Sequence, residues 1–369
     1  MFVQVEVEGF KRLRSHAFRF QPLTVLAGLN GSGKTSLIQS LLLAREAATA
    51  GGRSIRLNGL FGLELGVAEN VLNWGSKPPI SVSVNSGVGR SAWAFEVPEN
   101  ADALFLEIAA KPDRVPFAFS ANPRAFTYLD AERLGPRSVF QTAALPDDEL
   151  EVGPRGEHCA HVLSVLGDKS NPHPKRSHPG YTKSEPRLLK YEVEAWLSEI
   201  ARPIEVKGER FGASTVAELT FRSPGGEWVL ATNMGFGLSY ALPVVLGGLI
   251  AEEGGLFIVE NPEAHLHPSG QSRMGVFLAW LASKGVQVLL ETHSDHVLNG
   301  IRRAVAEYAY LPHTEAIIHY FAPDTEDGAA GGIEPISIKE SGSLSAWPPL
   351  FFDQYQIDVS ALGRAWRRS

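Results

Sequence analysis

The sequence has little of what exported or membrane-bound proteins depend on. Its 369 residues include one cysteine, Cys159, which excludes an intrachain disulfide and a zinc site made of several thiolates. The longest apolar run, ALPVVLGGLIA from Ala241, is too short to span a bilayer, and MFVQVEVEGF at the start alternates like a strand instead of a signal peptide. We therefore expect a buried helix at 241–251, a cytoplasmic protein, no membrane partner and an inert core thiol.

The sequence also has no excess of positive charge. Its formal net charge of −7 argues against a surface that traps nucleic acid as a whole, although a local basic groove would fit within this total. DNA therefore remains a possible partner. Apolar residues are plentiful at 44%, enough to build the core of one large α/β domain with insertions or of two average domains.

The order of expected elements indicates a parallel sheet with insertions. The buried run LTVLA is followed by a glycine-rich turn at 28–33 and then by a helix. Towards the C-terminus, strands alternate with helices at about 269–283 and 295–308, which predicts a sheet covered on both faces. Residues 54–130 are typical of short strands, an arm or wing on the core. Residues 167–187 predict an exposed, mobile loop, either a solvated linker or a basic finger that touches phosphate or a partner.

The strongest local signal is GLNGSGKTS from Gly28, which fits G-x-x-x-x-G-K-[ST]. Its glycines let backbone N–H groups and the N-terminus of the following helix face phosphates. Lys34 is then placed to reach the β and γ phosphates, and Thr35 to ligate Mg²⁺. The pattern predicts an ATP or GTP site formed by Asn30, Gly31, Ser32, Gly33, Lys34, Thr35 and Ser36.

A second stretch, LFIVENPEAHLHP at 256–268, crowds polar side chains after a buried strand. Glu260 stands where a P-loop protein needs an acid to hold magnesium through water. A zinc centre on His265 and His267, with His293 and His296, is an alternative, and it requires neutral imidazoles that converge. A third interpretation is that the first two histidines cap and pack a turn.

Together these motifs resemble the ABC-type ATPases of the SMC, RecF and OLD class, and within it the small OLD-like ATPases found beside bacterial defence genes. NMGFGLSYALPVV resembles the signature motif, LFIVENPEAHLHPSGQ the Walker B and D-loop region, and LLETHSDH the switch-histidine strand. The resemblance implies an α/β P-loop NTPase of ABC/SMC-head type, with a mixed core sheet, helices on both faces and an antiparallel β subregion. It implies a head over residues 1–320, an inserted β-rich and helical lobe at about 54–230, and a C-terminal segment, 321–369, that packs on the head.

The resemblance also assigns roles to single residues. Gly235, Gly237 and Ser239 match the signature that caps the γ phosphate of a nucleotide on the opposite subunit, which implies a homodimer around ATP and Mg²⁺. His293 matches the switch histidine that senses the γ phosphate. Further matches are weaker. Three arginines are expected to contact phosphate or to hold the lobes together, and for two of the three we expect the structural role. The segment WPPLFFDQ from Trp347 is expected to dock on the head or on a partner. The three arginines are Arg133, Arg137 and Arg155.

Two departures from the class bear on activity. The class has two adjacent acids before the proline, whereas here Asn261 follows Glu260. An amide cannot accept a proton as a base, so Asn261 orients water or Glu263 acts as the base, and we expect slow hydrolysis. Only about seventy residues follow His293, too few for a nuclease domain of the OLD type. We therefore expect an ATP-dependent switch for a separate effector such as a nuclease, or for a DNA-associated complex, in bacterial defence; the alternative is an ATP-gated scaffold with little or no hydrolysis.

Overall fold

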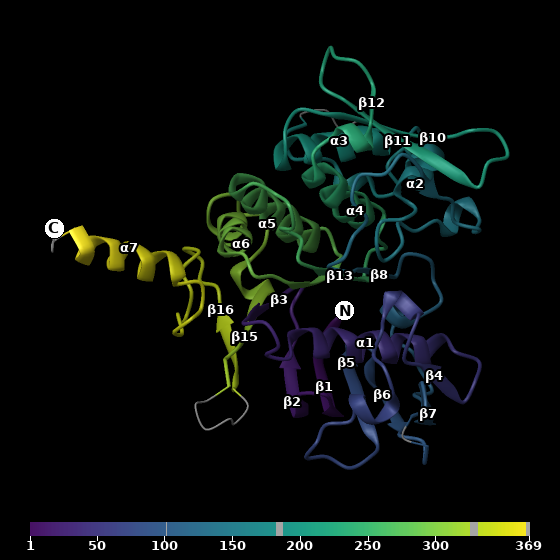
Figure 1. Cartoon of the computed structure of the whole chain (residues 1–369), viewed down its shortest axis with the longest axis vertical. Helices are drawn as coiled ribbons and strands as arrows, with labels where there is room; N and C mark the ends of the chain where they lie inside the picture. Colours follow the sequence, from purple (N-terminus) through teal and green to yellow (C-terminus); the bar gives the residue numbers. More distant parts are fainter. Residues whose placement is uncertain (101, 182–186, 325–330, 367–369) are drawn as a thin grey trace.

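The computed structural model describes residues 1–100, 102–181, 187–324 and 331–366 (Figure 1). A six-stranded core sheet lies across the middle of the molecule, with an antiparallel sheet below it and a helical lobe above it in that view. None of the helices in these ranges is long and apolar enough to cross a membrane.

The core sheet is mixed, as expected. Its strand order is β16-β15-β3-β14-β13-β8, and the strands from β15 to β8 are parallel while β16 pairs antiparallel with β15. Successive side chains of a strand point to opposite faces, so Leu256 and Ile258 enter the core shared with the antiparallel sheet, whereas Phe257 and Val259 enter the core shared with the helices. The strands are β3 (Leu23–Gly28), β8 (Phe126–Leu129), β13 (Leu256–Glu260), β14 (Gln287–Glu291), β15 (Ala316–Phe321) and β16 (Ile333–Ser337).

Helices cover both faces of this sheet. α1 contributes its apolar residues to the core between the two large sheets, and α4, α5 and α6 pack on the opposite face. The helices expected near 241–251, 269–283 and 295–308 are therefore confirmed. Their bounds are α1 (Lys34–Thr49), α4 (Phe236–Ile250), α5 (Pro268–Ser283) and α6 (Asp295–Ala306).

The antiparallel sheet corrects the interpretation of residues 54–130 as an arm or wing. Its order is β2-β1-β5-β6-β7-β4, so the strands of 54–110 extend the N-terminal hairpin and share its core. FTYL at 126–129, assigned to the same subregion, is instead β8 and pairs in parallel with β13. A four-residue buried run looks the same in either sheet, and only the tertiary pairing distinguishes them. The strands are β1 (Phe2–Phe10), β2 (Leu13–Arg19), β4 (Ser54–Arg56), β5 (Ile80–Ser86), β6 (Gly89–Glu96) and β7 (Phe105–Ala110).

The helical lobe holds a small sheet against two further helices. β9 and β10 both pair with β11, which also pairs with β12. Cys159 is buried on α2. The elements are α2 (Cys159–Leu166), α3 (Leu189–Ile200), β9 (Phe140–Gln141), β10 (Glu205–Arg210), β11 (Val216–Arg222) and β12 (Val229–Leu230). Short 3-10 helices occur at Leu60–Gly62, Ala68–Val71, Phe117–Phe119, Asp147–Glu149, Pro174–Arg176, Ala231–Asn233 and His313–Glu315.

The expected exposed loop at 167–187 is wrong for part of its length. Arg176 is buried, and its guanidinium donates to the carbonyls of Leu249 and Ala251 at the end of α4. The backbone N–H of His178 donates to the buried carboxylate of Glu192. A basic composition predicts exposure only when no buried acceptor is available, and here the last carbonyls of a helix supply one. Residues 168–170, 174–175 and 179–180 of the loop are exposed as expected, and 182–186 lie outside the described residues.

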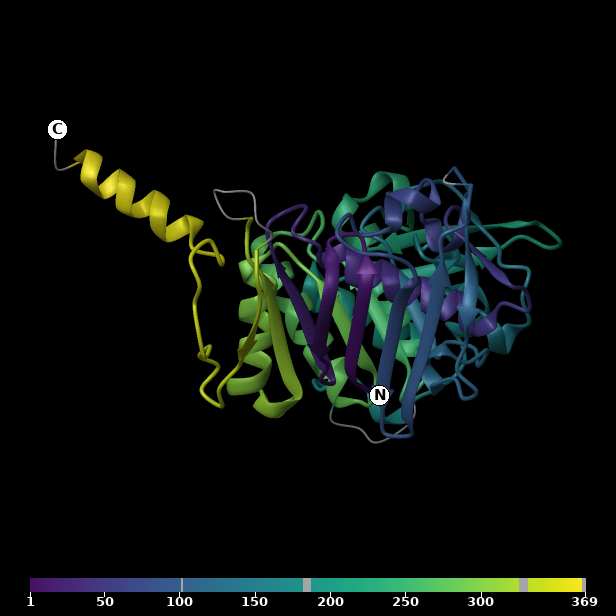
Figure 2. The same ribbon diagram turned by 90° about the horizontal axis from the view of Figure 1, so that it is seen from below.

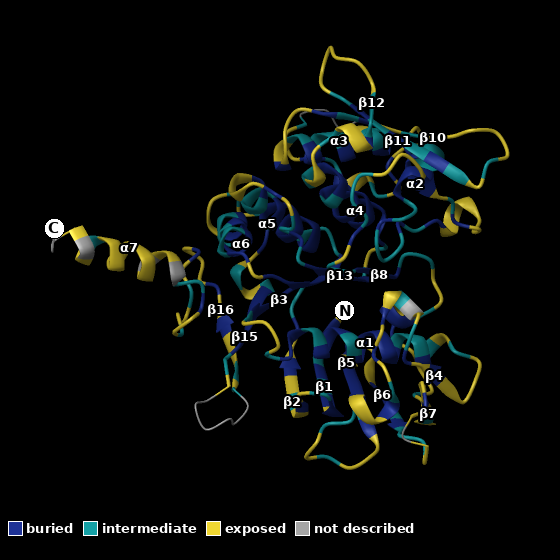
Figure 3. Cartoon of the chain, viewed as in Figure 1, coloured by how far each residue is buried: buried dark blue, intermediate teal, exposed yellow. Residues whose placement is uncertain are grey.

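The C-terminal segment leaves the core sheet and returns beside it before α7 (Gln354–Trp366) projects from the body (Figure 2). Phe351 is buried, with its ring edge-on to Tyr320, and the Tyr320 hydroxyl donates to the carbonyl of Pro349 at 2.8 Å. The described residues of α7 are mostly exposed, in contrast to the parallel strands of the core sheet (Figure 3). Residues 347–353 therefore lie against the head, whereas α7 points away from it (Figure 2).

Candidate nucleotide site

The P-loop connects the buried strand β3 to α1. Three of its glycines have positive φ, namely 143° at Gly28, 75° at Gly31 and 106° at Gly33. A Cβ on Gly28 would lie 2.3 Å from the carbonyl oxygen of Phe321, so only glycine fits where β3 meets β15. Gly31 has no atom near its missing Cβ, and Leu29 to Gly31 are exposed. The loop is thus closed on the sheet side and open to a ligand on the other.

Lys34, the first residue of α1, is folded into the loop. Its Nζ donates to the carbonyls of Gly28 at 3.0 Å and Leu29 at 2.7 Å, and it lies 3.7 Å from Glu291 Oε1. Burial lowers the pKa of Lys34, and the negative charge of Glu291 partly restores it. Thr35 donates its hydroxyl to Glu291, with distances of 3.0 and 3.3 Å to the two carboxylate oxygens.

Glu291 is a site residue that the sequence interpretation missed. It ends β14 and is paired in register with Glu260 at the end of β13. The signal was present, because two buried parallel strands each end in a glutamate, LFIVE and VQVLLE. The resemblance directs attention within LLETHSDH to the histidine, and only the strand register shows that the glutamate lies next to the P-loop.

Glu260 is buried at the end of β13, and its Oε1 accepts a hydrogen bond from the Tyr128 hydroxyl at 2.8 Å. Burial, together with the charge of Glu291, raises its pKa to about 8 against the opposing effect of the Tyr128 hydrogen bond. A carboxylate with so costly a negative charge is one that a divalent cation would stabilise.

Asn261 stands where the class has its second acid, and its backbone shows why an amide fits there. Its φ of 44° is left-handed, a region that asparagine tolerates better than glutamate. Its N–H donates to the carbonyl of Glu291 at 2.9 Å, and its own carbonyl accepts from Arg133 at 2.6 Å. Its side-chain Oδ1 is buried without a partner among the described residues, so it would have to become exposed before it could accept from water or a ligand.

Glu263 has both carboxylate oxygens engaged. Oε2 accepts from the Thr292 hydroxyl and Oε1 from the backbone N–H of His293, each at 2.8 Å. Burial raises the pKa of Glu263. His293 is partly exposed, with Nε2 3.8 Å from Glu291 Oε1, and burial together with the charge of Lys34 lowers its pKa. Glu263 therefore holds the histidine segment in place, which leaves it poorly arranged to serve as a base.

The signature residues divide into exposed and buried positions. Gly235 is the exposed N-cap of α4, while a Cβ on Gly237 would lie 2.9 Å from the carbonyl oxygen of His265. Ser239 lies a turn further along and is buried, with no partner for its Oγ in the described part of the chain. The phosphate contact expected from the Ser239 hydroxyl is therefore not available in this conformation, because the helix turns that side chain inward.

The histidines of the H-x-H pair do not converge. His265 packs against Tyr240, with ring centroids 4.5 Å apart, and His267 caps α5 by accepting from the N–H of Ser269. His296 lies beside Asp295 on α6. Within the described ranges no group of three or more histidine, cysteine or acidic side chains is placed to hold a metal by itself. These contacts match the capping and packing interpretation.

The three arginines differ in role. Arg133 is buried, and it donates to the carbonyls of Asp130 at 2.9 Å, Glu260 at 2.7 Å and Asn261 at 2.6 Å. Arg155 forms an ion pair with Glu132 at 2.8 Å, and Arg137 is exposed. Arg133 thus fixes the turn after β13, and Arg155 holds a neighbouring loop.

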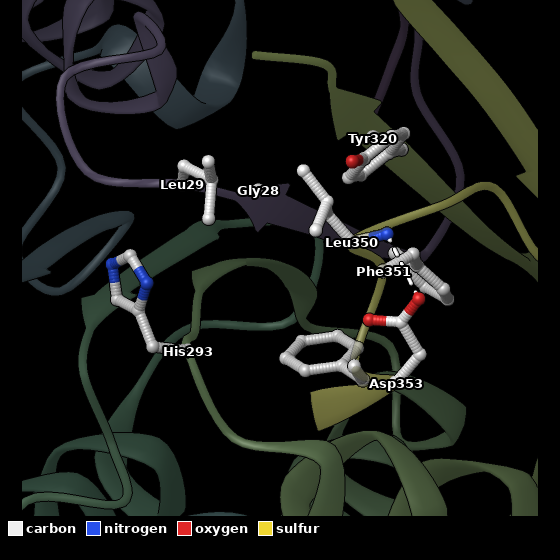
Figure 4. A pocket seen from close by; sticks show the side chains of 8 residues that line it. Gly28, Leu29, His293, Tyr320, Leu350, Phe351 and Asp353 are labelled. Carbon is white, nitrogen blue, oxygen red and sulfur yellow. Dashed lines mark hydrogen bonds between the residues drawn. The ribbon is translucent and has the colours of Figure 1, made fainter. Parts of the chain in front are cut away.

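The C-terminal segment forms one wall of a cavity of about 210 Å³ beside the P-loop (Figure 4). The opposite wall is made by Gly28, Leu29 and His293. Leu350 donates its N–H to Asp353 at 3.0 Å, which fixes the bend of the segment. WPPLFFDQ therefore lies next to the candidate nucleotide site, with Tyr320, Leu350, Phe351, Phe352 and Asp353 lining this cavity.

The side chains present fit Mg²⁺ and a nucleoside triphosphate. The Thr35 hydroxyl and the carboxylates of Glu260 and Glu291 are the hard oxygen ligands that magnesium prefers. Lys34 and the open N-terminus of α1 lie beside them and would bind phosphate.

Comparison with family models agrees with this geometry. Residues 23–299, well over half of the chain, match the family described as "AAA domain, putative AbiEii toxin, Type IV TA system". The chain belongs to this family. Residues 311–362 match a second family, described as a protein of unknown function (DUF3696), which covers the segment beside the P-loop. No curated protein matches.

Solved structures show the fold of this AAA-domain protein more directly. It resembles an SmcHead bound to the C-winged helix domain of ScpA, with a TM-score of 0.51 and 14% identity over 92% of this chain and 98% of that one. It also resembles the Smc head domain of Pyrococcus furiosus bound to the C-terminal domain of ScpA, with a TM-score of 0.52 and 10% identity over 98% and 99% of the two chains. The expected P-loop fold of SMC-head type is thus confirmed.

Proposed function

We propose that this AAA-domain protein binds ATP with Mg²⁺, hydrolyses it slowly and uses the bound nucleotide to close a homodimer. The observation that carries the proposal is the convergence of Lys34 and Thr35 on Glu291 beside a glycine loop, with Glu260 level with Glu291 on the neighbouring strand. Family and fold support nucleotide binding, while the reaction and the dimer are inferred from the site.

Each side chain has a task in this reaction. Lys34 would leave the carbonyls of Gly28 and Leu29 to bind phosphate oxygens, and Thr35 and Glu260 would hold Mg²⁺. The metal would supply neutralisation of the charge that develops on the phosphates. Asn261 would orient water only if its buried Oδ1 became exposed, and an amide cannot accept a proton, so turnover should be slow.

The dimer rests on a second helix N-terminus. The N-cap of α4, Gly235, is exposed and has no atom within 4 Å of a Cβ placed there. The positive end of a helix dipole at an open glycine suits a phosphate, and on a second copy it would cover the exposed side of the P-loop. The bound nucleotide would then bridge the two copies and stabilise the dimer.

The biological setting is proposed from the family alone. Its description names a toxin and a toxin–antitoxin system, which supports a switch subunit that controls a separate effector, such as a nuclease, or a DNA-associated complex in bacterial defence. The small OLD-like subgroup remains our assignment within the broader class.

An ATP-gated scaffold is the second candidate, and Asn261 favours it. Because this residue is an amide in a left-handed conformation, the site lacks the acid that the class uses at this position. A scaffold would bind ATP and dimerise with little or no release of phosphate.

Phosphate release under multiple turnover separates these functions. The wild type should release phosphate slowly, and Lys34→Ala should lower both ATP binding and release by at least about a hundredfold, since it removes the cation that binds the phosphates. Tight ATP binding without release that depends on Lys34 would favour the scaffold. Absence of ATP binding would exclude both functions.

Light scattering tests the dimer with matched glycine variants. Gly235→Glu places a negative charge at the N-terminus of α4 in open space, so it should leave folding intact and prevent the dimer that ATP induces. Gly87→Glu, on a turn that is equally open, is the control and should dimerise like the wild type. A dimer of Gly235→Glu as stable as the wild type would contradict the proposed interface.

A further inference from the structure

Glu291 is a buried carboxylate in contact with the two P-loop side chains that act on nucleotide. It is 5% exposed. Its oxygens accept from Thr35 at 3.0 and 3.3 Å and lie 3.7 Å from Lys34 Nζ and 3.8 Å from His293 Nε2. Glu291 thus lies between Lys34 and Thr35, at the start of α1, and His293, which follows β14.

These contacts are poor for a purely structural ion pair. A buried salt bridge offsets its desolvation cost only when its geometry is excellent and its remaining polar positions are satisfied. Here the hydrogen bonds of Lys34 Nζ go to the carbonyls of Gly28 and Leu29, and Glu291 is beyond hydrogen-bond distance of that nitrogen. The hydrogen bond that Glu291 does receive comes from Thr35, the expected ligand of Mg²⁺.

The two paired glutamates face different neighbours. Glu260 receives its hydrogen bond from Tyr128 on β8, on the far side of β13, whereas Glu291 faces Thr35 and Lys34. The neighbouring position 261 carries no acid, and its N–H donates to the carbonyl of Glu291. The second carboxylate at the nucleotide site therefore comes from β14, one strand away from the position at which the class has it.

We propose that Glu291 is a second acidic residue of the magnesium site, and that it makes nucleotide binding depend on Mg²⁺. The proposal rests on the proposed ATP binding and extends it. Glu291 holds Thr35 and lies beside Lys34, in the place where Mg²⁺ and phosphate would bind. Without the metal, its negative charge repels the phosphates; with the metal, the same charge binds the cation that joins protein and nucleotide.

This role predicts opposite effects of one substitution under two conditions. Glu291→Gln removes the charge and keeps a similar size. In EDTA it should increase ATP affinity by about tenfold, because the repulsion is gone, and with Mg²⁺ it should lower ATP affinity by about tenfold, because a ligand to the metal is lost. The enhancement of ATP binding by Mg²⁺ should therefore fall by about a hundredfold.

The experiment is titration of a fluorescent ATP analogue into the full chain, with Mg²⁺ and with EDTA, together with circular dichroism to confirm folding. Glu192→Gln is the matched control, because Glu192 is equally buried and accepts from Ser177 and the N–H of His178 in the helical lobe. It should keep the wild-type ratio of the two affinities. Glu291→Asp, which retains the charge, should keep the weak binding in EDTA and lose part of the enhancement by Mg²⁺.

Other outcomes would overturn the proposal in distinguishable ways. Equal loss of affinity in both conditions for Glu291→Gln would mean that the residue only supports the P-loop. An unchanged ratio would mean that Glu260 and Thr35 suffice for the metal. If Glu291→Gln does not fold, Glu291→Asp is used instead, and its binding of Mn²⁺ in the presence of ATP is measured by electron paramagnetic resonance. An affinity for Mn²⁺ equal to that of the wild type would refute the proposed role. Absence of ATP binding by the wild type would refute the proposed function as well.

Discussion

The strands β13 and β14 lie side by side, run in parallel and each end in a buried glutamate, yet their ends are built differently. After Glu260 the chain enters a left-handed turn at Asn261, and Arg133 donates hydrogen bonds to the carbonyls of both residues. After Glu291 it continues into Thr292 and His293, both held by Glu263. One end is fixed by a buried arginine and the other by a half-buried carboxylate.

This difference shows how a site can move by one strand without a change of fold. A left-handed turn favours asparagine at the position where the class has its acid. The register of a parallel pair then places the acid of the next strand level with it, next to the P-loop. A residue's role in such a site follows from what its side chain faces, and its position in a motif is a weaker guide.

Removal of the Arg133 guanidinium, which binds the turn after β13, should have the largest effect. Arg133→Ala leaves three carbonyls without their donor in a buried space, so we expect a loss of about 3 kcal/mol or more in the free energy of unfolding. Urea denaturation measures this. Arg137→Ala, at an exposed arginine nearby, should stay within about 0.5 kcal/mol of the wild type. Equal effects would mean that Arg133 does not support the turn.

The second largest effect is expected at the Glu263 carboxylate, which binds the segment after β14. Glu263→Gln makes both hydrogen bonds neutral instead of charge-assisted and requires the Thr292 hydroxyl to accept from the new amide, so we expect a loss of about 2 kcal/mol in the free energy of unfolding. Hydrogen exchange at the N–H of His293 should accelerate with it. Glu149→Gln, at an exposed acid, is the control. If Glu263→Gln abolished phosphate release while exchange at His293 stayed at the wild-type rate, Glu263 would act as the base after all.

The pH dependence of stability sharpens the comparison of the two glutamates. Between the ordinary pKa of 4.5 and the raised pKa of about 8, folded Glu260 retains a proton that the unfolded chain has released. Stability in EDTA should therefore fall as pH rises through this window, by roughly 1.4 kcal/mol per pH unit at most, and level off above it. Thermal denaturation from pH 5 to 9 measures this, and Glu260→Gln should flatten the profile. If the stability of Glu260→Gln changed with pH as steeply as that of the wild type, the titrating group would be a residue other than Glu260.

The smallest effect is expected at the turn itself. Asn261→Ala must adopt the left-handed conformation without the tolerance of asparagine, so we expect a loss of about 1 kcal/mol in the free energy of unfolding. Asn261→Gly should be close to the wild type, because glycine enters this conformation freely. A larger loss for glycine than for alanine in urea denaturation would show that the side-chain amide, and not the backbone, fixes the turn.

Much of the fold could be predicted because its signals are local. The P-loop, its helix and the alternating strands and helices near the C-terminus are each specified within a few neighbouring residues. The assignment of β8 failed for the opposite reason, because four buried residues carry no record of which sheet they join. Arg176 was expected to be exposed, since composition does not show that the end of α4 needs a donor.

By itself, the sequence determined the glycine loop, the lysine and threonine that follow it, and the acid at the end of a buried strand, because turn, helix start and strand end are each local. Tertiary structure alone decided which side chains meet there. It turned Ser239 inward, packed His265 on Tyr240, and brought Glu291 to Thr35 across 256 positions of sequence. Such contacts depend on strand register and helix orientation, which are set by packing of the whole core and are not encoded at any single position.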